Sequence, residues 1–138
     1  MICAVHAAVG AAIGKLTGKR LGAFGSGVAT HLICDLLPHK DFDPKVEAPL
    51  LAATLGVIAV HCGVASPEMA GAVGAIAPDF ENAAGLVGII PRESMRFPSH
   101  VGLGKYHGPV TKSAWPQGVL AALCLLFVLW PRSSSKKG

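Results

Sequence analysis

Histidine and aspartate recur at four-residue spacing in the segment 30–41, which reads THLICDLLPHKD. His31, Asp35 and His39 are expected to lie on one stripe of a helix, because side chains four residues apart stack on the same face. Imidazole nitrogens and carboxylate oxygens are ligands of zinc and related divalent metals. The segment therefore predicts a shared cation site. The alternative is an intrahelical hydrogen bond between His31 and Asp35 that stabilises a buried polar pair.

A further candidate ligand follows an apolar stretch in the middle of the chain. Asp79 comes directly after Pro78, and this proline is expected to end the helix 68–78 because it lacks a backbone donor. The polar group 79–82 is too polar for lipid and is expected to separate that helix from the apolar stretch 83–90. Asp79 is then either a metal ligand or the N-terminal cap of the helix that follows it.

More ionisable residues are assigned to the same cluster. His6 lies in an apolar N-terminal helix without an acidic residue, so it needs a partner from another helix. His100 and His107 lie in a polar segment, and ordinary solvated loop histidines are the alternative there. Asp41 and Glu81 are the candidates for a general base. The predicted metal ligands are His6, His31, Asp35, His39, Asp79, His100 and His107.

The composition indicates which elements position these residues. The chain has 138 residues, of which 51% are hydrophobic and 14% charged, and this is too apolar for an ordinary soluble domain of that size. Aromatic residues are only 6%, which favours close-packed helices rich in small residues. The sequence therefore predicts an all-α fold with one domain over residues 1–131 and a basic flexible tail at 132–138. That domain is expected to be a compact bundle of about four to five membrane helices with a polar loop before the last helix.

Apolar segments give the expected helices. They lie at 1–14, 21–38, 48–66, 68–90 with its polar break, and 113–130. Gly10, Gly14 and Gly18 repeat every four residues, which would let another helix approach the first one closely. Trp115 and Trp130 bracket the last segment and suit the two membrane interfaces. Five crossings, with the basic groups at 15–20 and in the tail on the cytoplasmic side, bring all the candidate residues to one membrane face.

The remaining polar features are assigned no chemistry. The four cysteines lie singly in apolar segments and are expected to be buried free thiols, and His61 is expected to be a packed neutral histidine far from the cluster. The net charge of +4 could suggest nucleic acid as a partner. The basic residues are scattered among loops and the tail without interleaved aromatic residues, so no nucleic-acid binding is expected.

The order of these motifs resembles that of small bacterial membrane proteins described as metal-dependent hydrolase-like. The resemblance covers most of the chain, from the helix with His6, through THLICDLLPHKD and GAIAPD, to a late histidine segment before the last helix. The late segment FPSH is poorer in histidine than in that family. More distantly, the spacing of His31 and Asp35 is similar to the zinc-binding His-x-x-x-Asp helix of zinc-dependent phospholipase C and the trinuclear-zinc nucleases. The late His and Glu helix of those enzymes is missing here.

The residues and the resemblance together imply a hydrolase embedded in the bacterial cytoplasmic membrane, in which one or two divalent ions, most readily zinc, activate water. A phosphoester at the membrane surface is the expected substrate, with membrane lipid as the partner. A non-enzymatic metal-binding scaffold or small transport component, whose polar cluster is structural, is the alternative. A soluble helical domain would require the apolar segments to bury one another completely.

Overall fold

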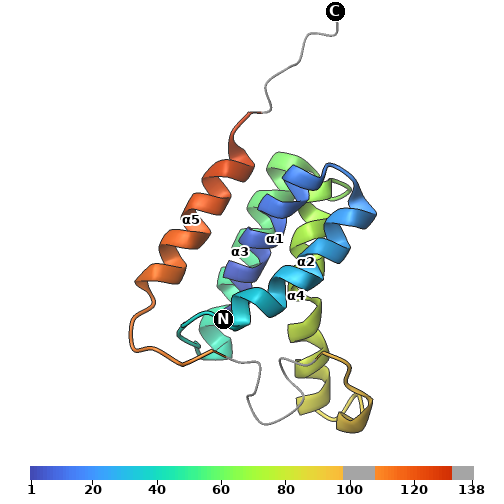
Figure 1. Ribbon diagram of the computed structural model, residues 1–138, viewed down its shortest axis with the longest axis vertical. Helices are drawn as coiled ribbons and strands as arrows, with labels where there is room; N and C mark the ends of the chain where they lie inside the picture. The colour runs from blue at the N-terminus through green and yellow to red at the C-terminus, as the bar shows by residue number, and fades with distance from the viewer. Residues whose placement is uncertain (98–107, 132–138) are drawn as a thin grey trace, which may run out of the picture.

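The computed structural model describes residues 1–97 and 108–131, and this part of the chain forms five α-helices and one 3-10 helix, with no strand (Figure 1). The all-α prediction is therefore confirmed. The helices are α1 (Cys3–Thr17), α2 (Arg20–Asp35), α3 (Pro44–Cys62), α4 (Pro67–Leu86), the 3-10 helix η1 (Arg92–Ser94) and α5 (Trp115–Leu129).

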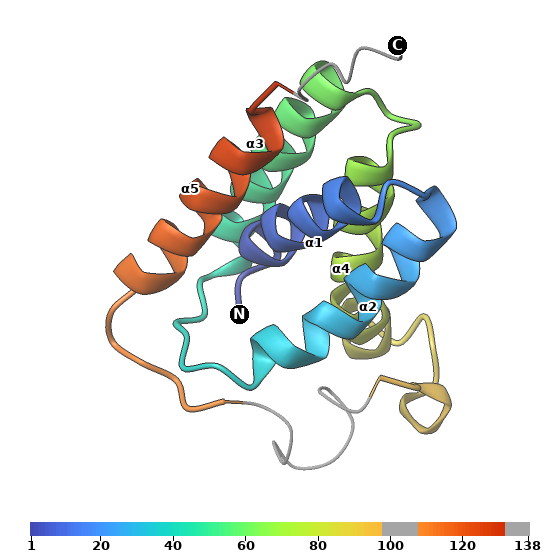
Figure 2. The same ribbon diagram turned by 45° about the horizontal axis from the view of Figure 1, so that its top comes forward.

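Helix α1 lies at the centre of the bundle, with α2 and α4 on one side and α3 and α5 on the other (Figure 2). Its alanines make this position possible, because Ala7, Ala8 and Ala11 are completely buried and their small side chains let four helices surround one. The chain turns from α1 into α2 at Gly18, whose φ of 70° is a left-handed conformation that glycine adopts without a steric penalty.

Glycine residues bring α1, α2 and α4 into backbone contact. A Cβ added to Gly10 would lie 2.3 Å from the carbonyl oxygen of Gly71, and one added to Gly14 would lie 2.2 Å from that of Pro67. A Cβ added to Gly27 on α2 would also lie 2.3 Å from the Gly71 carbonyl oxygen. The predicted close approach at Gly10 and Gly14 is therefore confirmed, whereas Gly18 serves the turn. These contacts fix how α4 lies along α1.

Helix α4 runs without a break through Pro78, so the predicted helix end at this residue is wrong. Pro78 is fully buried, and the helix carries buried residues on both sides of it, from Gly71 to Gly85. Packing on both sides therefore offsets the local cost of an interior proline, about 3 kcal/mol. Asp79 lies inside this helix, so the prediction that it could cap a following helix is also wrong.

Helices α3 and α5 form an outer, apolar layer. Ile58 is the buried residue of α3, and Gln117 and Val128 are those of α5. Within the described residues, only α3 is both long and apolar enough to cross a membrane, and 11% of its apolar window is buried; α1 and α5 are shorter apolar helices. A helix in the core of a soluble protein would be mostly buried. The expected four to five crossings thus reduce to one candidate span.

Candidate metal centre

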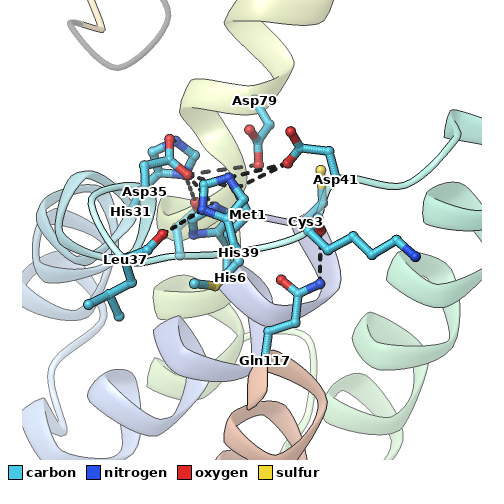
Figure 3. A network of polar contacts seen from close by, with 12 residues as sticks. Met1, Cys3, His6, His31, Asp35, Leu37, His39, Asp41, Asp79 and Gln117 are labelled. Carbon is cyan, nitrogen blue, oxygen red and sulfur yellow. Dashed lines mark hydrogen bonds and ion pairs between the residues drawn. The ribbon is translucent and has the colours of Figure 1, made fainter. Parts of the chain in front are cut away.

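Three helices bring polar side chains together at one end of the bundle (Figure 3). His6 comes from α1, His31 and Asp35 from the last turns of α2, and Asp79 from α4. The exposed fractions of His6, His31 and Asp35 are 0%, 1% and 1%. The site is thus enclosed by protein, and its charges must be paired with one another or with a cation.

The glycine contacts explain why Asp79 reaches this group. Gly10 meets Gly71, and four residues further along α1 Gly14 meets Pro67, so α1 and α4 are antiparallel. Moving back one turn from Gly10 leads to His6, and moving forward two turns from Gly71 leads to Asp79. The close helix packing and the polar cluster therefore depend on the same register.

Asp35 is the centre of the hydrogen-bond network. Its Oδ1 lies 3.0 Å from His6 Nε2 and 3.0 Å from the Met1 ammonium, and its Oδ2 lies 3.0 Å from His31 Nε2. Burial alone would raise the pKa of Asp35, but the hydrogen bonds from His31 and His6 and the charge of the ammonium hold it well below its usual range. Asp35 is therefore an ionised carboxylate.

The pKa values of the two imidazoles are shifted in opposite directions. Their rings stack with centroids 4.1 Å apart. His31 meets acceptors at both nitrogens, since Nδ1 lies 2.7 Å from the Ala75 carbonyl oxygen and 3.9 Å from Asp79 Oδ2. Burial lowers the pKa of His31, but Asp35 and Asp79 outweigh it and raise the pKa overall. Burial dominates for His6 and lowers its pKa, so the neutral form is favoured there.

One atom of this cluster is a ready ligand. His6 donates through Nε2 to Asp35, while its buried Nδ1 has no hydrogen-bond partner among the described residues. In the neutral ring this leaves the Nδ1 lone pair available to a cation. A carboxylate that accepts from the other ring nitrogen is the usual way in which metal-binding histidines are oriented, and Asp35 is in that position.

His6, His31 and Asp79 each offer a ligand atom within 4.8 Å of the other two. Zinc binds nitrogen and oxygen at about 2.0–2.2 Å, so its ligands lie about 3.4 Å apart in a tetrahedral site. Side-chain movements of about 1 Å, with His31 Nδ1 turning from the Ala75 carbonyl oxygen, are enough to close this group on an ion. These residues therefore could hold a metal ion.

His39 lies beside the cluster but outside the three-residue group. Helix α2 ends at Asp35, so the prediction that His39 continues its stripe is wrong; Pro38 follows too soon for another helical turn. His39 is buried, with Nε2 3.2 Å from Asp41 Oδ1 and Nδ1 2.7 Å from the Leu37 carbonyl oxygen. Its backbone also pairs with Val110. His39 thus ties the connector after α2 to the segment before α5.

The two candidate bases lie in different surroundings. The side chain of Asp41 is 51% exposed, and its Oδ1 lies 3.8 Å from the Met1 ammonium. Glu81 accepts hydrogen bonds of 3.0 Å from the backbone amides of Arg96 and Phe97. Because Glu81 comes two residues after Asp79, it points about 200° away around α4. Its contacts are those of a residue that holds the segment after η1.

Two residues near Asp79 were missed in the sequence. Cys3 Sγ lies 3.5 Å from Glu47 Oε2, and both line a cavity of about 320 Å³ that also includes Asp79. Cys3 was interpreted only as a free thiol, although it precedes His6 by three residues and so shares its helix face. Glu47 carried no signal, because it lies in the first turn of α3, where an acidic residue is ordinary. The rest of the cavity wall is apolar and comprises Pro44, Ala48, Leu51, Ala83 and Leu86 next to Asn82.

The remaining histidines lie elsewhere. His61 is exposed and sits at the far end of α3, where its Nε2 lies 3.0 Å from the Leu129 carbonyl oxygen. The predicted separation of His61 from the cluster is confirmed, but its predicted burial is wrong. The predicted ligands His100 and His107 lie outside the described residues.

Comparisons of the chain with protein-family models, with curated proteins and with solved structures found no match.

Proposed function

We propose that this chain is a membrane-embedded, metal-dependent hydrolase in which His6, His31 and Asp79 hold one divalent cation. The observation that supports this most strongly is the grouping of three ligand atoms within 4.8 Å, two from buried histidines and one from the partly exposed Asp79. The buried His6 Nδ1, which has no hydrogen-bond partner among the described residues, points to the same conclusion. Without a cation this nitrogen is desolvated and gains nothing in return.

The composition of the ligand set favours zinc. Two imidazoles and one carboxylate are a common zinc set, and three protein ligands leave a fourth position for water or substrate, as catalytic zinc sites do. A bound cation of this kind acts as a Lewis acid and lowers the pKa of water that it coordinates. Asp35 orients His6, and the loss of its hydrogen bond would loosen the imidazole.

The cavity beside Asp79 that Cys3 and Glu47 line is the proposed substrate site. Its volume of about 320 Å³ is at the lower end of the range of ligand pockets, about 300–1,000 Å³. Glu47 lies in its wall and is the proposed general base, in preference to Asp41 and Glu81, because neither of those two residues lines this cavity. The mostly apolar wall suits the aliphatic part of a lipid phosphoester.

A membrane location agrees with the surface of α3 and α5. The side chains of Val60, Leu123 and Leu126 are 90%, 60% and 64% exposed, which is unfavourable in water for a continuous apolar layer. Trp115 and Trp130 at the two ends of α5 are 71% and 74% exposed, in positions that suit membrane interfaces. The substrate would then reach the cavity beside Asp79 from the bilayer.

A structural role for the cluster is the second candidate. Asp35 accepts hydrogen bonds from His6 and His31 and pairs with the Met1 ammonium, so this buried carboxylate is already satisfied without a metal. In that case the chain is a non-enzymatic membrane protein, and the polar network holds the ends of α1 and α2 together.

Metal analysis of the purified full chain separates the two candidates. The protein is purified without chelators. We expect about one zinc per chain in the wild type and in the control variant His61→Ala. The zinc content of His6→Ala and of Asp79→Ala should be less than about a tenth of that. A metal-free wild type would exclude the hydrolase and leave the structural role. With metal bound, phosphodiester hydrolysis should fall about 100-fold in Glu47→Gln at unchanged zinc content.

A further inference from the structure

A different cavity, of about 320 Å³, lies between α1, α3 and α5, and Asp79 is not among the residues that line it. Its wall includes Ile2 and Val5 from the start of α1, Leu50 from α3 and Ala121 from α5. None of the residues that line it is charged, and no proposed metal ligand is among them. The cavity is therefore a separate site with an almost wholly apolar wall.

Gln117 is the exception in this wall. It is 4% exposed, and its Nε2 donates a hydrogen bond of 2.8 Å to the carbonyl oxygen of Lys40. This contact fixes the orientation of the amide, because only the nitrogen can donate. The other atom, Oε1, is buried and accepts no hydrogen bond from any described residue. A glutamine in the most apolar helix of the chain thus presents an acceptor that needs a donor.

Water is a poor candidate for that donor. A buried water molecule usually makes about three hydrogen bonds. The other polar side chain in the wall is Thr54, whose hydroxyl donates to the Leu50 carbonyl oxygen at 2.9 Å and can only accept from a water. A water that donates to Gln117 Oε1 and to Thr54 would make two hydrogen bonds with these side chains, one fewer than is usual. A ligand that combines an aliphatic chain with one hydroxyl group would instead fill the apolar space and donate to Gln117 Oε1. An ionised head group is disfavoured, because no charged side chain lines the wall to pair with it.

We propose that this cavity binds an uncharged long-chain alcohol, a lipid-class ligand whose hydroxyl donates to Gln117 Oε1 and whose chain lies between α3 and α5. The volume, near the lower limit of small-molecule pockets, suits one aliphatic chain. The site is independent of the proposed metal centre, and neither depends on the other being correct.

Two probes that differ in a single donor test the proposal. The full chain in bilayer nanodiscs, with isotope-labelled alanine and valine methyl groups, is titrated with decanol and with decyl methyl ether. We expect saturable shifts of the Ala4, Val5 and Ala121 methyl signals with decanol, and binding of the ether, which cannot donate, that is about tenfold weaker. Equal affinities for the two probes, or shifts that never saturate, would overturn the proposal.

Variants locate the binding in the cavity. Gln117→Met keeps the size of the side chain and should bind both probes equally. Ala121→Leu fills the cavity and should remove saturable binding, whereas Ala122→Leu, at the neighbouring exposed position, should bind like the wild type. An unchanged preference for decanol in Gln117→Met would contradict the assignment of the donor. The comparison of the two probes in the wild type decides the question even if a variant does not fold.

Discussion

The two halves of the bundle are held together differently. Helices α1, α2 and α4 meet through backbone contacts at Gly10, Gly27 and Gly71 and enclose a polar cluster, whereas α3 and α5 present bulky apolar side chains outward. The first half contains its own partners, whereas the second half leaves large apolar side chains such as Val60 and Leu123 exposed. The geometry of the polar cluster therefore depends on close packing between α1, α2 and α4, whereas α3 and α5 contribute much of the exposed apolar surface.

The largest effect should come from removing the central carboxylate. The Asp35→Ala substitution removes the acceptor that His6, His31 and the Met1 ammonium share. A buried charge without its partner lowers the unfolding free energy by about 3–5 kcal/mol. Chemical unfolding measures the loss. Asp41→Ala, whose carboxylate is 51% exposed, is the control and should cost less than about 1 kcal/mol. Equal losses in the two variants would show that burial of the network contributes nothing.

A glycine pair tests the contrast in packing directly. The added Cβ of Gly71→Ala would lie 2.1 Å from the Gly10 carbonyl oxygen, so α1 and α4 must separate, and we expect a loss of about 2–3 kcal/mol. Gly56 on α3 has open space around its Cβ position, and Gly56→Ala should stabilise the protein by about 0.5–1 kcal/mol through helix propensity. Chemical unfolding of the wild type and of both variants in the same buffer gives the two changes in unfolding free energy. Stabilisation by both substitutions would mean that α1 and α4 are not in close contact.

Acidification should weaken the first half through Asp35. Its folded-state pKa is lowered, so its contribution to stability is present above the unfolded pKa, about 3.9, and is lost as the pH falls below that value. The difference in unfolding free energy between the wild type and Asp35→Ala should therefore shrink by about 1 kcal/mol per pH unit below pH 4. A constant difference from pH 6 to pH 3 would mean that Asp35 is not ionised in the fold.

The smallest effect is expected at the attachment of α5. Lys15 Nζ donates to the Phe127 and Val128 carbonyl oxygens at 2.8 and 3.0 Å and so caps the end of that helix. In Lys15→Met, amide hydrogen exchange in the last turn of α5 should become roughly three- to tenfold faster, while α4 is unchanged. Faster exchange in α4 as well would show that the two halves open together.

The sequence predicts the features that depend on the spacing of apolar residues and on the cost of burying isolated charges. The all-α fold and the grouping of His6, His31, Asp35 and Asp79 follow from apolar periodicity and from the cost of isolated charges in an apolar fold. The continuation of α4 through Pro78 could not be predicted, because packing on both sides of the proline outweighs its local preference. Membrane crossings could not be counted, because an apolar segment looks alike whether its partner is lipid or another helix.

Glu47 and Gln117 show most clearly what the sequence alone does not predict. Neither lies in a motif, and each gains its meaning from residues far away in the sequence: Glu47 from Cys3, and Gln117 from Lys40 and the cavity between three helices. An acidic residue in the first turn of a helix and one amide in an apolar helix are both common. Only the tertiary arrangement distinguishes them from ordinary surface residues.

The antiparallel register of α1 and α4 has a thermodynamic consequence. Gly10 and Gly71 fix that register, and the same register sets the separation of His6 from Asp79. If the proposed ion binds, ion binding and helix association are linked equilibria: an ion that binds only the assembled pair would raise the unfolding free energy by mass action, and loosening the pair would lower the ion affinity by the same factor. Under that proposal, the thermal stability of the bundle would itself report the ion concentration.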